Sequence, residues 1–308
     1  SICVPAGIGD ISWCYSKLCC LKKLTGREVI LSVAGKDKPR RGGDFVQLLP
    51  EVRWGGYLDD RESWQVLSQS LPAEWNPGMD VGFLFKPWIQ NLSVNLHLEN
   101  GHKLADFWPK LPTDYHYPLS IAEEDSEAAA EIISRLPRQT IAVYVSGSDK
   151  DRIKAGGWSL WNAHQWIEFL HQVTAVHGCH GVGFILTGAE YDRNKTEVVA
   201  AGLLAAGHPV EKVIAQPLGV ALECLRRSDY FFSFPSGIGI LANVLRVPGV
   251  MLLPRILHQM KAAYADPRDL KAGRYRAWPD PQPAEVLAWF RQFGSRHIGQ
   301  EKAAWQPS

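Results

Sequence analysis

The sequence predicts an α/β protein built from two domains, each with a parallel sheet covered by helices. The chain has 308 residues, which favours two domains over one. Short apolar runs alternate with helical stretches in both halves. A Pro-rich stretch and an acidic, Ala-rich stretch separate the two halves near residue 120. These three observations fix the expected class before any single motif is considered.

The composition is that of an ordinary soluble globular protein, with 46% hydrophobic and 21% charged residues. The formal net charge is +1, so an anionic partner must be held locally rather than by the overall charge. No apolar run is long enough for a transmembrane segment, and the N-terminus lacks the basic flank of a signal peptide. We therefore expect a cytoplasmic chain, with peripheral membrane contact left open.

The first half begins with a strand over 2–5, a glycine turn over 7–10, a helix over 11–24 and a strand over 28–33. Further apolar strands are predicted over 45–50, 54–58 and 81–85, with polar connections between them. We place an N-terminal Rossmann-like domain over residues 1–122 and a linker helix over 123–138.

The second half begins with "TIAVYVSGS" at 140–148, a nearly continuous apolar run that is typical of a strand buried on both faces and that breaks into a Ser/Gly loop. Helices over 162–173, 192–206, 220–227 and 237–245 then alternate with strands over 181–188, 212–216, 230–234 and 249–254. This alternation predicts a doubly wound, Rossmann-like sheet, and we place this domain over residues 139–270. The tail, 271–308, contains a helix over 285–293 that we expect to pack back on the N-terminal domain.

The turn "PAGIGD" follows the first strand, where open parallel sheets bind ligands. Gly7 and Gly9 allow close approach of the backbone, but the third glycine of the dinucleotide fingerprint is missing. The incomplete fingerprint argues against an NAD-dependent oxidoreductase. On local grounds Asp10 is either a helix-capping acid or a catalytic carboxylate.

Three turns of the second domain are candidates for binding a nucleotide. In "VSGSDKDRIKAGGW", hydroxyl and amide groups can donate to a phosphate and Lys154 can supply charge, although the Walker sequence is absent. In "LTGAEYDR", an acid can accept hydrogen bonds from ribose hydroxyls. In "FPSGIGILANVL", a serine N-cap precedes two glycines that would each cost about 1 kcal/mol inside a helix, which favours a diphosphate at the helix start. The candidate donor-binding residues are Gly9, Ser146, Gly147, Ser148, Lys154, Thr187, Gly188, Glu190, Asp192, Ser236, Gly237, Ile238 and Gly239.

In their order, these pieces resemble glycosyltransferase family 9, the ADP-heptose:lipopolysaccharide heptosyltransferases. The resemblance rests on "AGIGDISW", "VSGSDKDRIKAGGWSLWNAHQW", "ILTGAEYD" and "FPSGIGILANVL". It implies the GT-B fold, two facing Rossmann-like domains with a cleft between them, and it makes Asp10 the base. The chain departs from the family at two positions. The family's phosphate-binding lysine falls on Ser159, so Lys154 is proposed as its substitute, and Pro235 stands where the family often has Asp.

The leading hypothesis is an inverting, metal-independent glycosyltransferase that moves a sugar from a nucleotide-diphosphate sugar to an acceptor hydroxyl. No metal or other cofactor is expected, because no Asp-X-Asp motif lies in a candidate site. A basic segment and an aromatic residue are candidates for an acceptor that is a saccharide, a glycolipid or a modified nucleic acid base such as that of DNA. These acceptor candidates are Lys36, Lys38, Arg40, Arg41 and Trp88. A GT-B sugar-nucleotide epimerase and a catalytically silent nucleotide-sugar-binding subunit are the alternatives.

Overall fold

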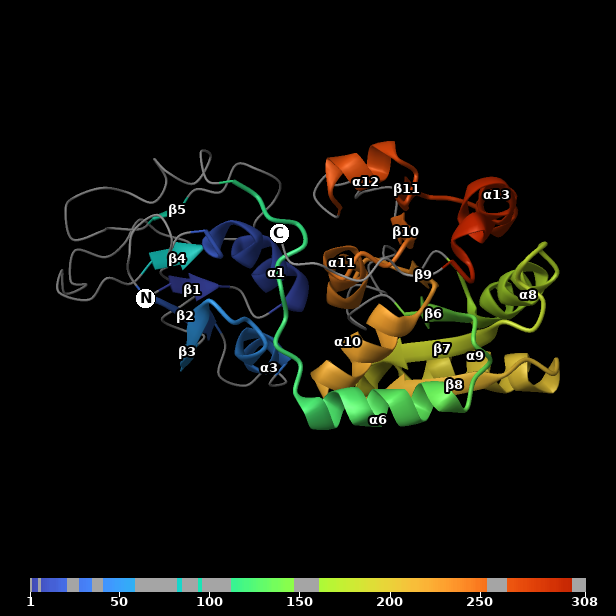
Figure 1. The fold of residues 1–308 in the computed structure, drawn as a ribbon, viewed down its shortest axis with the longest axis horizontal. Helices are drawn as coiled ribbons and strands as arrows, with labels where there is room; N and C mark the ends of the chain where they lie inside the picture. Colours follow the sequence, from blue (N-terminus) through green and yellow to red (C-terminus); the bar gives the residue numbers. More distant parts are fainter. Residues whose placement is uncertain are drawn as a thin grey trace. The chain divides into compact units, whose positions relative to one another are not determined.

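The computed structural model describes residues 2–4, 7–20, 28–34, 41–58, 82–84, 94–95, 112–146, 161–253 and 265–300. The chain divides into two compact units, Ser1–Ser120 (unit 1) and Ile121–Ser308 (unit 2), which are coloured from blue to red along the chain in Figure 1. Each unit contains one sheet and is described by itself.

Unit 1 contains a five-stranded sheet with the order β3-β2-β1-β4-β5. Its strands are β1 (Ile2–Val4), β2 (Val29–Ala34), β3 (Val52–Leu58), β4 (Gly82–Leu84) and β5 (Val94–Asn95). The first four run parallel, and β5 pairs antiparallel with β4. Helix α1 (Ile8–Leu18) follows β1, and the short helix α3 (Arg41–Gln47) lies between β2 and β3.

Two elements of unit 1 differ from the sequence prediction. Helix α1 begins three residues earlier than expected, because Gly7 is its N-cap and its carbonyl accepts the first helical bond from Ile11 N at 2.9 Å. The predicted strand over 45–50 is wrong, because residues up to Gln47 belong to α3. Gly43 lets this helix pack closely on β3: its N–H donates to the Tyr57 hydroxyl at 3.0 Å, and a side chain there would collide with Trp54 and Tyr57.

Unit 2 contains a six-stranded, all-parallel sheet with the order β11-β10-β9-β6-β7-β8. Its strands are β6 (Thr140–Tyr144), β7 (Gly183–Gly188), β8 (Val210–Ile214), β9 (Tyr230–Ser233), β10 (Gly249–Leu253) and β11 (Tyr275–Pro279). In chain order the sheet grows from β6 to β8 on one side and from β9 to β11 on the other. The order therefore reverses between β6 and β9, which is the switch point where doubly wound sheets bind ligands.

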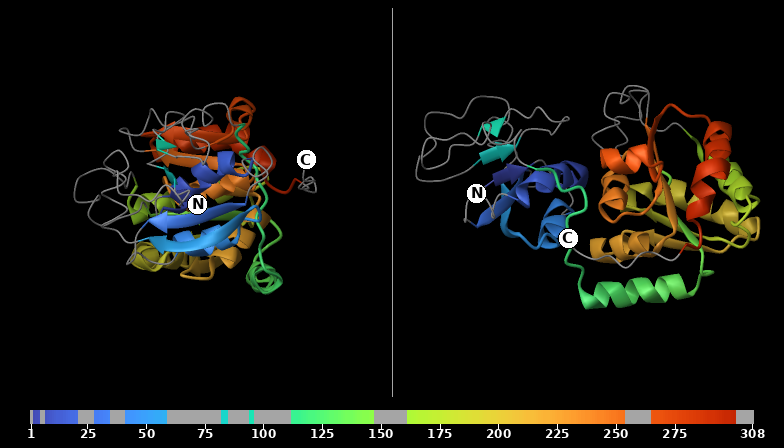
Figure 2. Two further views of the ribbon diagram at one scale, coloured as in Figure 1. Left: turned by 90° about the vertical axis from the view of Figure 1, so that its left-hand side faces the viewer. Right: turned by 45° about the horizontal axis from the view of Figure 1, so that its top comes forward.

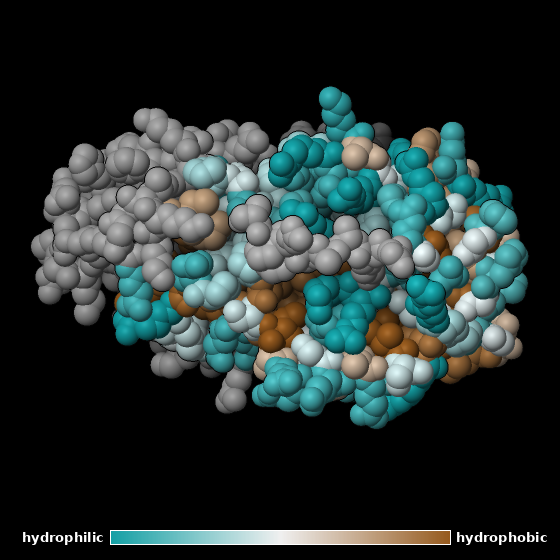
Figure 3. All heavy atoms as spheres, in the orientation of Figure 1, coloured by the Kyte–Doolittle hydropathy of each residue, from teal (hydrophilic) through white to brown (hydrophobic). Residues whose placement is uncertain are grey.

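Helices cover both faces of the unit 2 sheet. Helices α8 (Ala163–Thr174), α9 (Arg193–Ala205) and α13 (Pro283–Trp289) bury their apolar sides in one large core. On the other face, α6 (Glu123–Ser134) and α10 (Leu218–Arg227) lie side by side over a smaller core (Figures 1 and 2). The outer side of α6 is mainly hydrophilic in Figure 3. Burial on both faces explains why these strands read as continuous apolar runs.

The predicted tail helix is α13, and it contributes Val286 and Leu287 to the large core of unit 2. A π-helical turn over Phe290–Gly294 follows it and adds Phe290 to the same core. Helices α11 (Gly237–Val244) and α12 (Pro267–Lys271) precede β10 and β11. Among the described residues, every helix is too short or too polar to cross a bilayer.

The two middle strands of the unit 2 sheet are fixed in register by a reciprocal pair of bonds. The N–H of Thr140 donates to the Asp229 carboxylate at 2.8 Å. The N–H of Asp229 donates to the carbonyl of Thr140 at 2.9 Å. These bonds align the starts of β6 and β9, and therefore also the ends that border the switch point.

Candidate functional site

Asp10 is the third residue of α1 and lies in the first turn of that helix. Its side chain is half-buried and folds back over Gly7, so that a Cβ atom at residue 7 would lie 2.7 Å from Oδ2 of Asp10. Gly9, the residue before it, is half-buried in the same turn. An acid in the first turn favours the helix, and a partly exposed carboxylate can also accept a proton from a bound hydroxyl. Asp10 is therefore not the N-cap, which is Gly7, but its place in the first turn is compatible with a helix-stabilising role and with a catalytic one.

Helix α1 is held firmly in unit 1 by two tyrosines. The hydroxyl of Tyr117 donates to Oγ of Ser12 at 2.7 Å in the buried interior. The rings of Tyr117 and Tyr15 meet edge to face, with centroids 4.7 Å apart, and burial raises the pKa of both hydroxyls. The Tyr15 hydroxyl in turn accepts a bond from Glu51 N at 3.3 Å. These contacts fix the helix that carries Asp10.

In unit 2, Ser146 and Ser236 follow the two strands that border the switch point. Ser146 is half-buried two residues after the end of β6. Ser236 follows β9, and Phe234 N, just after that strand, still bonds to the carbonyl of Tyr144 at 3.3 Å. The ends of β6 and β9 are thus neighbours. Gly147, Ser148 and Lys154 lie outside the described residues.

The start of α11 has the geometry that the sequence predicts. Ser236 is the N-cap, with extended backbone, and its Oγ accepts a bond from Gly239 N at 3.1 Å. In the first turn of a helix, the N–H groups lack a carbonyl partner within the helix, so those of Gly237 and Ile238 are suited to an anion. Such a group is favoured further by the positive end of the helix dipole.

Gly239 has a packing role that the sequence argument did not include. A Cβ atom at this position would lie 2.5 Å from Oγ of Ser233 and 2.6 Å from Cε of Met251. The missing side chain therefore lets α11 approach β9 and β10 closely. Oγ of Ser233 is buried beneath this helix start and makes no hydrogen bond with the described residues.

The two acids after β7 lie in different surroundings. Asp192 is 1% exposed, and its Oδ2 accepts bonds from Ala189 N at 2.7 Å and from the Tyr144 hydroxyl at 3.1 Å. Glu190 is exposed and forms two bonds of 2.8 Å with Arg193, which lowers the pKa of its carboxyl. Asp192 thus holds the turn together, whereas Glu190 faces solvent at the same edge. Thr187 is buried in β7, and Gly188 ends this strand close to Asp192.

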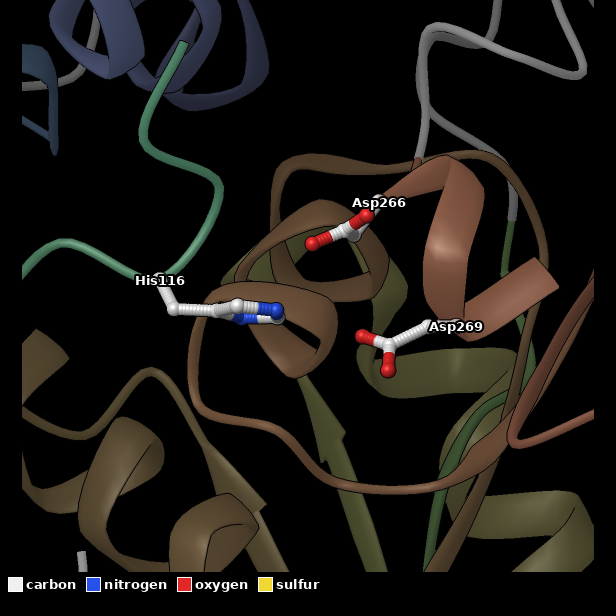
Figure 4. Close-up of side chains that lie close together, drawn as sticks. All are labelled: His116, Asp266 and Asp269. Carbon is white, nitrogen blue, oxygen red and sulfur yellow. The ribbon is translucent and has the colours of Figure 1, made fainter. Parts of the chain in front are cut away.

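A polar network braces α11 from the side of α12. Oδ1 of Asn243 accepts a bond from Asp266 N at 3.0 Å, and its Nδ2 donates to Asp269 at 3.2 Å. Figure 4 shows the carboxylates of Asp266 and Asp269 near each other at α12, where Asp266 caps that helix. The Tyr275 hydroxyl donates to the carbonyl of Gly239 at 3.3 Å. The orientation of α11 is therefore fixed by buried hydrogen bonds as well as by apolar packing.

Lys195 is a candidate that the sequence argument missed. It is the third residue of α9, and its Nζ donates to the carbonyl of Trp161 at 2.8 Å and lies 5.1 Å from the ring centroid of Phe234. Burial lowers its pKa to about 8. A cation in the first turn opposes the helix dipole, so a lysine is unfavourable at this position. That unfavourable position is the signal in the sequence that could have drawn attention to Lys195.

Of the acceptor candidates, Arg41 is described. It is half-buried and is the first residue of α3 in unit 1. Lys36, Lys38, Arg40 and Trp88 lie outside the described residues.

The two α/β units, each built on one mainly parallel sheet, have the fold class of the GT-B glycosyltransferases. No protein-family model and no curated protein sequence matches the chain. Among solved structures, the chain is similar to the E. coli ADP-heptose LPS heptosyltransferase II, with a TM-score of 0.60 and 14% identity over 95% of this chain and 97% of that chain.

A glycosyl transferase family 9 structure from Veillonella parvula is also similar, with a TM-score of 0.60 and 11% identity over 95% of both chains. The E. coli heptosyltransferase WaaC with ADP follows, with a TM-score of 0.52 and 13% identity over 96% of this chain and 99% of that chain. Identities this low establish a shared fold. They confirm the fold class predicted from the sequence.

Proposed function

We propose that this protein is an inverting, metal-independent glycosyltransferase that uses a nucleotide-diphosphate sugar as donor. The observation that carries the proposal is the pair of polar strand ends at the switch point of unit 2. Ser146 follows β6, and the capped start of α11 follows β9 directly beside it. Hydroxyl and N–H donors that converge at such a point are suited to a diphosphate. The WaaC structure with ADP supports the same class of donor.

In the proposed donor complex, the first-turn N–H groups of α11 and the Ser146 hydroxyl bind the diphosphate. The exposed carboxylate of Glu190 accepts hydrogen bonds from the ribose, because Asp192 is occupied within its turn. As the bond to the sugar breaks, negative charge grows on the leaving diphosphate. Fixed donors aimed at that charge stabilise the transition state and take the role that a metal ion has in other enzymes.

In the proposed reaction, Asp10 is the general base. Its carboxylate takes the proton of the acceptor hydroxyl while the hydroxyl oxygen forms a bond to the anomeric carbon. The bond from that carbon to the diphosphate oxygen breaks on the opposite face, and its electron pair leaves with the nucleoside diphosphate. The configuration at the anomeric carbon is therefore inverted.

The proposed acceptor carries negative charge, because the basic segment 36–41 lies in unit 1 with Asp10. A lipid-linked saccharide, a saccharide phosphate and DNA with a hydroxylated base all meet this requirement. They differ in the salt dependence of binding, which is steep for DNA because bound cations are released.

The first test is a thermal-shift screen of nucleotide sugars, followed by transfer assays with the donor that stabilises the protein most. Asp10→Asn is expected to lower transfer by about 10²-fold or more, as for loss of a general base, with donor affinity unchanged. Asp44→Asn is the matched control, since Asp44 is an exposed acid in the first turn of α3 in the same unit.

Normal turnover by Asp10→Asn would exclude Asp10 as the base. Isomerised donor in the absence of any acceptor would identify an epimerase. Tight donor binding without transfer, hydrolysis or isomerisation, whatever acceptor is supplied, would identify a silent binding subunit.

A further inference from the structure

We propose that His171 and His208 form an acid-sensitive contact that joins α8 to the turn leading from α9 into β8. Their rings meet nitrogen to nitrogen, with Nδ1 of His171 2.8 Å from Nε2 of His208. The ring centroids are 5.1 Å apart, so the two nitrogens lie between the rings and point at each other. Such a bond needs a proton on one nitrogen and a lone pair on the other. We refer to these two residues as the histidine pair.

Backbone bonds hold His208 in place at the start of β8. Gly207, which follows α9, has the left-handed conformation, with a φ of 81°. The N–H of His208 donates to the carbonyl of Leu203 at 3.0 Å, and the carbonyl of Pro209 accepts a bond from Phe184 N at 2.9 Å. The ring of Phe184 meets that of His208 edge to face. The histidine pair therefore lies where β7 and β8 begin, at the edge of the sheet opposite the proposed diphosphate site.

The strength of the contact depends on how many protons the two rings carry. When both rings are neutral, one donates an N–H and the other accepts it. One added proton strengthens the bond, because the donor is then charged. His171 is the favoured carrier of that charge, since it lies in the last turn of α8, where the helix dipole attracts a cation. A second proton places an N–H on both facing nitrogens, so the bond is replaced by repulsion between two cations.

The surroundings of His208 make this second proton costly. Burial is the largest cause of the lowered pKa of His208, and the charge of His171 lowers it further. The folded protein therefore binds the proton less readily than the unfolded chain, in which a histidine titrates at about pH 6.5. The stability that the contact contributes is complete above about pH 6.5. It is lost as the pH falls through the lowered pKa of His208.

The charged groups on the elements around the histidine pair have partners of their own. On α8, Glu168 accepts a bond from Gln172 at 3.2 Å. Glu197 of α9 and Lys212 of β8 form an ion pair of 2.6 Å. Among the described residues, the ionisable group that shifts the pKa of His208 is its partner in the histidine pair. The pH dependence is therefore assigned to the pair itself.

The first experiment is a double-variant cycle on the full chain with His171→Ala, His208→Ala and the two changes together. Urea unfolding at pH 8 and at pH 5 gives the coupling between the two positions. At pH 8 the double variant should lose less than the sum of the two single losses, because both single changes remove the same bond. At pH 5 this coupling should vanish or change sign, because both rings are then charged. No coupling at pH 8, or equal coupling at both values, would overturn the inference.

A second cycle, with His177→Ala in place of His171→Ala, is the matched control. His177 is an exposed histidine in the turn after α8. Its coupling to His208 should be close to zero at both pH values. A coupling as large as that of His171, with the same pH dependence, would assign the effect to general charge on this surface and overturn the inference.

A further measurement follows the wild type by amide hydrogen exchange, expressed as protection factors at pH 8 and pH 5. Protection of the Phe184 and His208 N–H groups should fall about fivefold or more at pH 5. The N–H of Gly249, which bonds to the carbonyl of Arg274 at 3.0 Å where β10 begins, should stay within twofold. In His171→Ala the Phe184 and His208 groups should show low protection at both values. An equal loss at Gly249, or no loss at Phe184 and His208, would contradict a local acid-sensitive contact.

Discussion

The carboxylate of Asp10 occupies the space beside Gly7, with Oδ2 only 2.7 Å from the place where a Cβ atom of residue 7 would be. The N-cap of α1 therefore controls where this carboxylate can lie. Through this contact, Gly7 of the turn "PAGIGD" restricts the position of Asp10, the proposed base, within the first turn of α1.

Gly7→Ala is expected to displace the Asp10 carboxylate and to lower transfer at least tenfold. Stability should fall by about 1 kcal/mol, because alanine is a poorer N-cap than glycine and the carboxylate can swing away. Measurement of kcat and of donor affinity separates these effects, since the proposed diphosphate-binding residues lie in unit 2. The double variant with Asp10→Asn should be no slower than Asp10→Asn alone. Additive losses would mean that Gly7 acts by some route other than Asp10.

Substitutions of Asp192 and Glu190 should affect different properties: the first should lower stability, and the second should weaken nucleoside binding. Asp192→Ala leaves the Tyr144 hydroxyl and the Ala189 N–H buried without their acceptor, at a cost of about 2–4 kcal/mol in unfolding free energy. Glu190→Gln should keep the wild-type melting temperature and weaken nucleoside binding severalfold. Thermal melting and calorimetry on both variants test the assignment. Unchanged nucleoside affinity in Glu190→Gln would remove this residue from the donor site.

Asn243 should contribute to the stability of unit 2. Asn243→Leu removes the bonds that Asn243 makes with the Asp269 carboxylate and the Asp266 N–H, and we expect a loss of about 2–4 kcal/mol in the unfolding transition of unit 2. Asn194→Leu, at an exposed position of α9, is the matched control and should change little. Urea unfolding followed by circular dichroism measures both. If Asn194→Leu lowers the unfolding free energy as much, the loss comes from replacing any asparagine with leucine and not from breaking the hydrogen bonds of Asn243.

Chelation of divalent ions should leave transfer within twofold of its starting rate. The N–H groups of α11 and the Ser146 hydroxyl are proposed to stabilise the charge of the leaving group, so no ion is required. The measurement is the initial rate after dialysis against EDTA, with and without added Mg²⁺ or Mn²⁺. Loss of activity that Mg²⁺ or Mn²⁺ restores would contradict a metal-independent mechanism.

Much of unit 2 could be predicted from the sequence, because its strands are buried on both faces and its helices have one apolar side. Strands β6, β7 and β9 and helices α8, α9 and α11 lie within about two residues of the predicted bounds. Strand β11, the edge strand that contains Arg276 and Pro279, was not predicted from the sequence. Charged residues and proline are tolerated at an edge, so the pattern of a buried strand is absent there.

The candidate site was predictable where it depends on local chemistry. Ser236 caps α11 as expected, because an N-cap needs only neighbouring residues. The packing role of Gly239 depends on Ser233 and Met251 from two strands. The surroundings of Lys195 come from Trp161 and Phe234, which are distant in the chain. Contacts of this kind are created by the fold, so no local pattern reveals them.

The reciprocal bonds between Thr140 and Asp229 also have a consequence for how the protein folds. They join residues 89 positions apart, so the central strand pair of unit 2 can form only after a long loop has closed. On the ribosome, β6, β7 and β8 are made first, yet β6 lacks its second neighbour until β9 has emerged. A nascent chain that stops before residue 229 therefore exposes an apolar strand edge, and this is the stage at which unit 2 is most prone to aggregate or to need a chaperone.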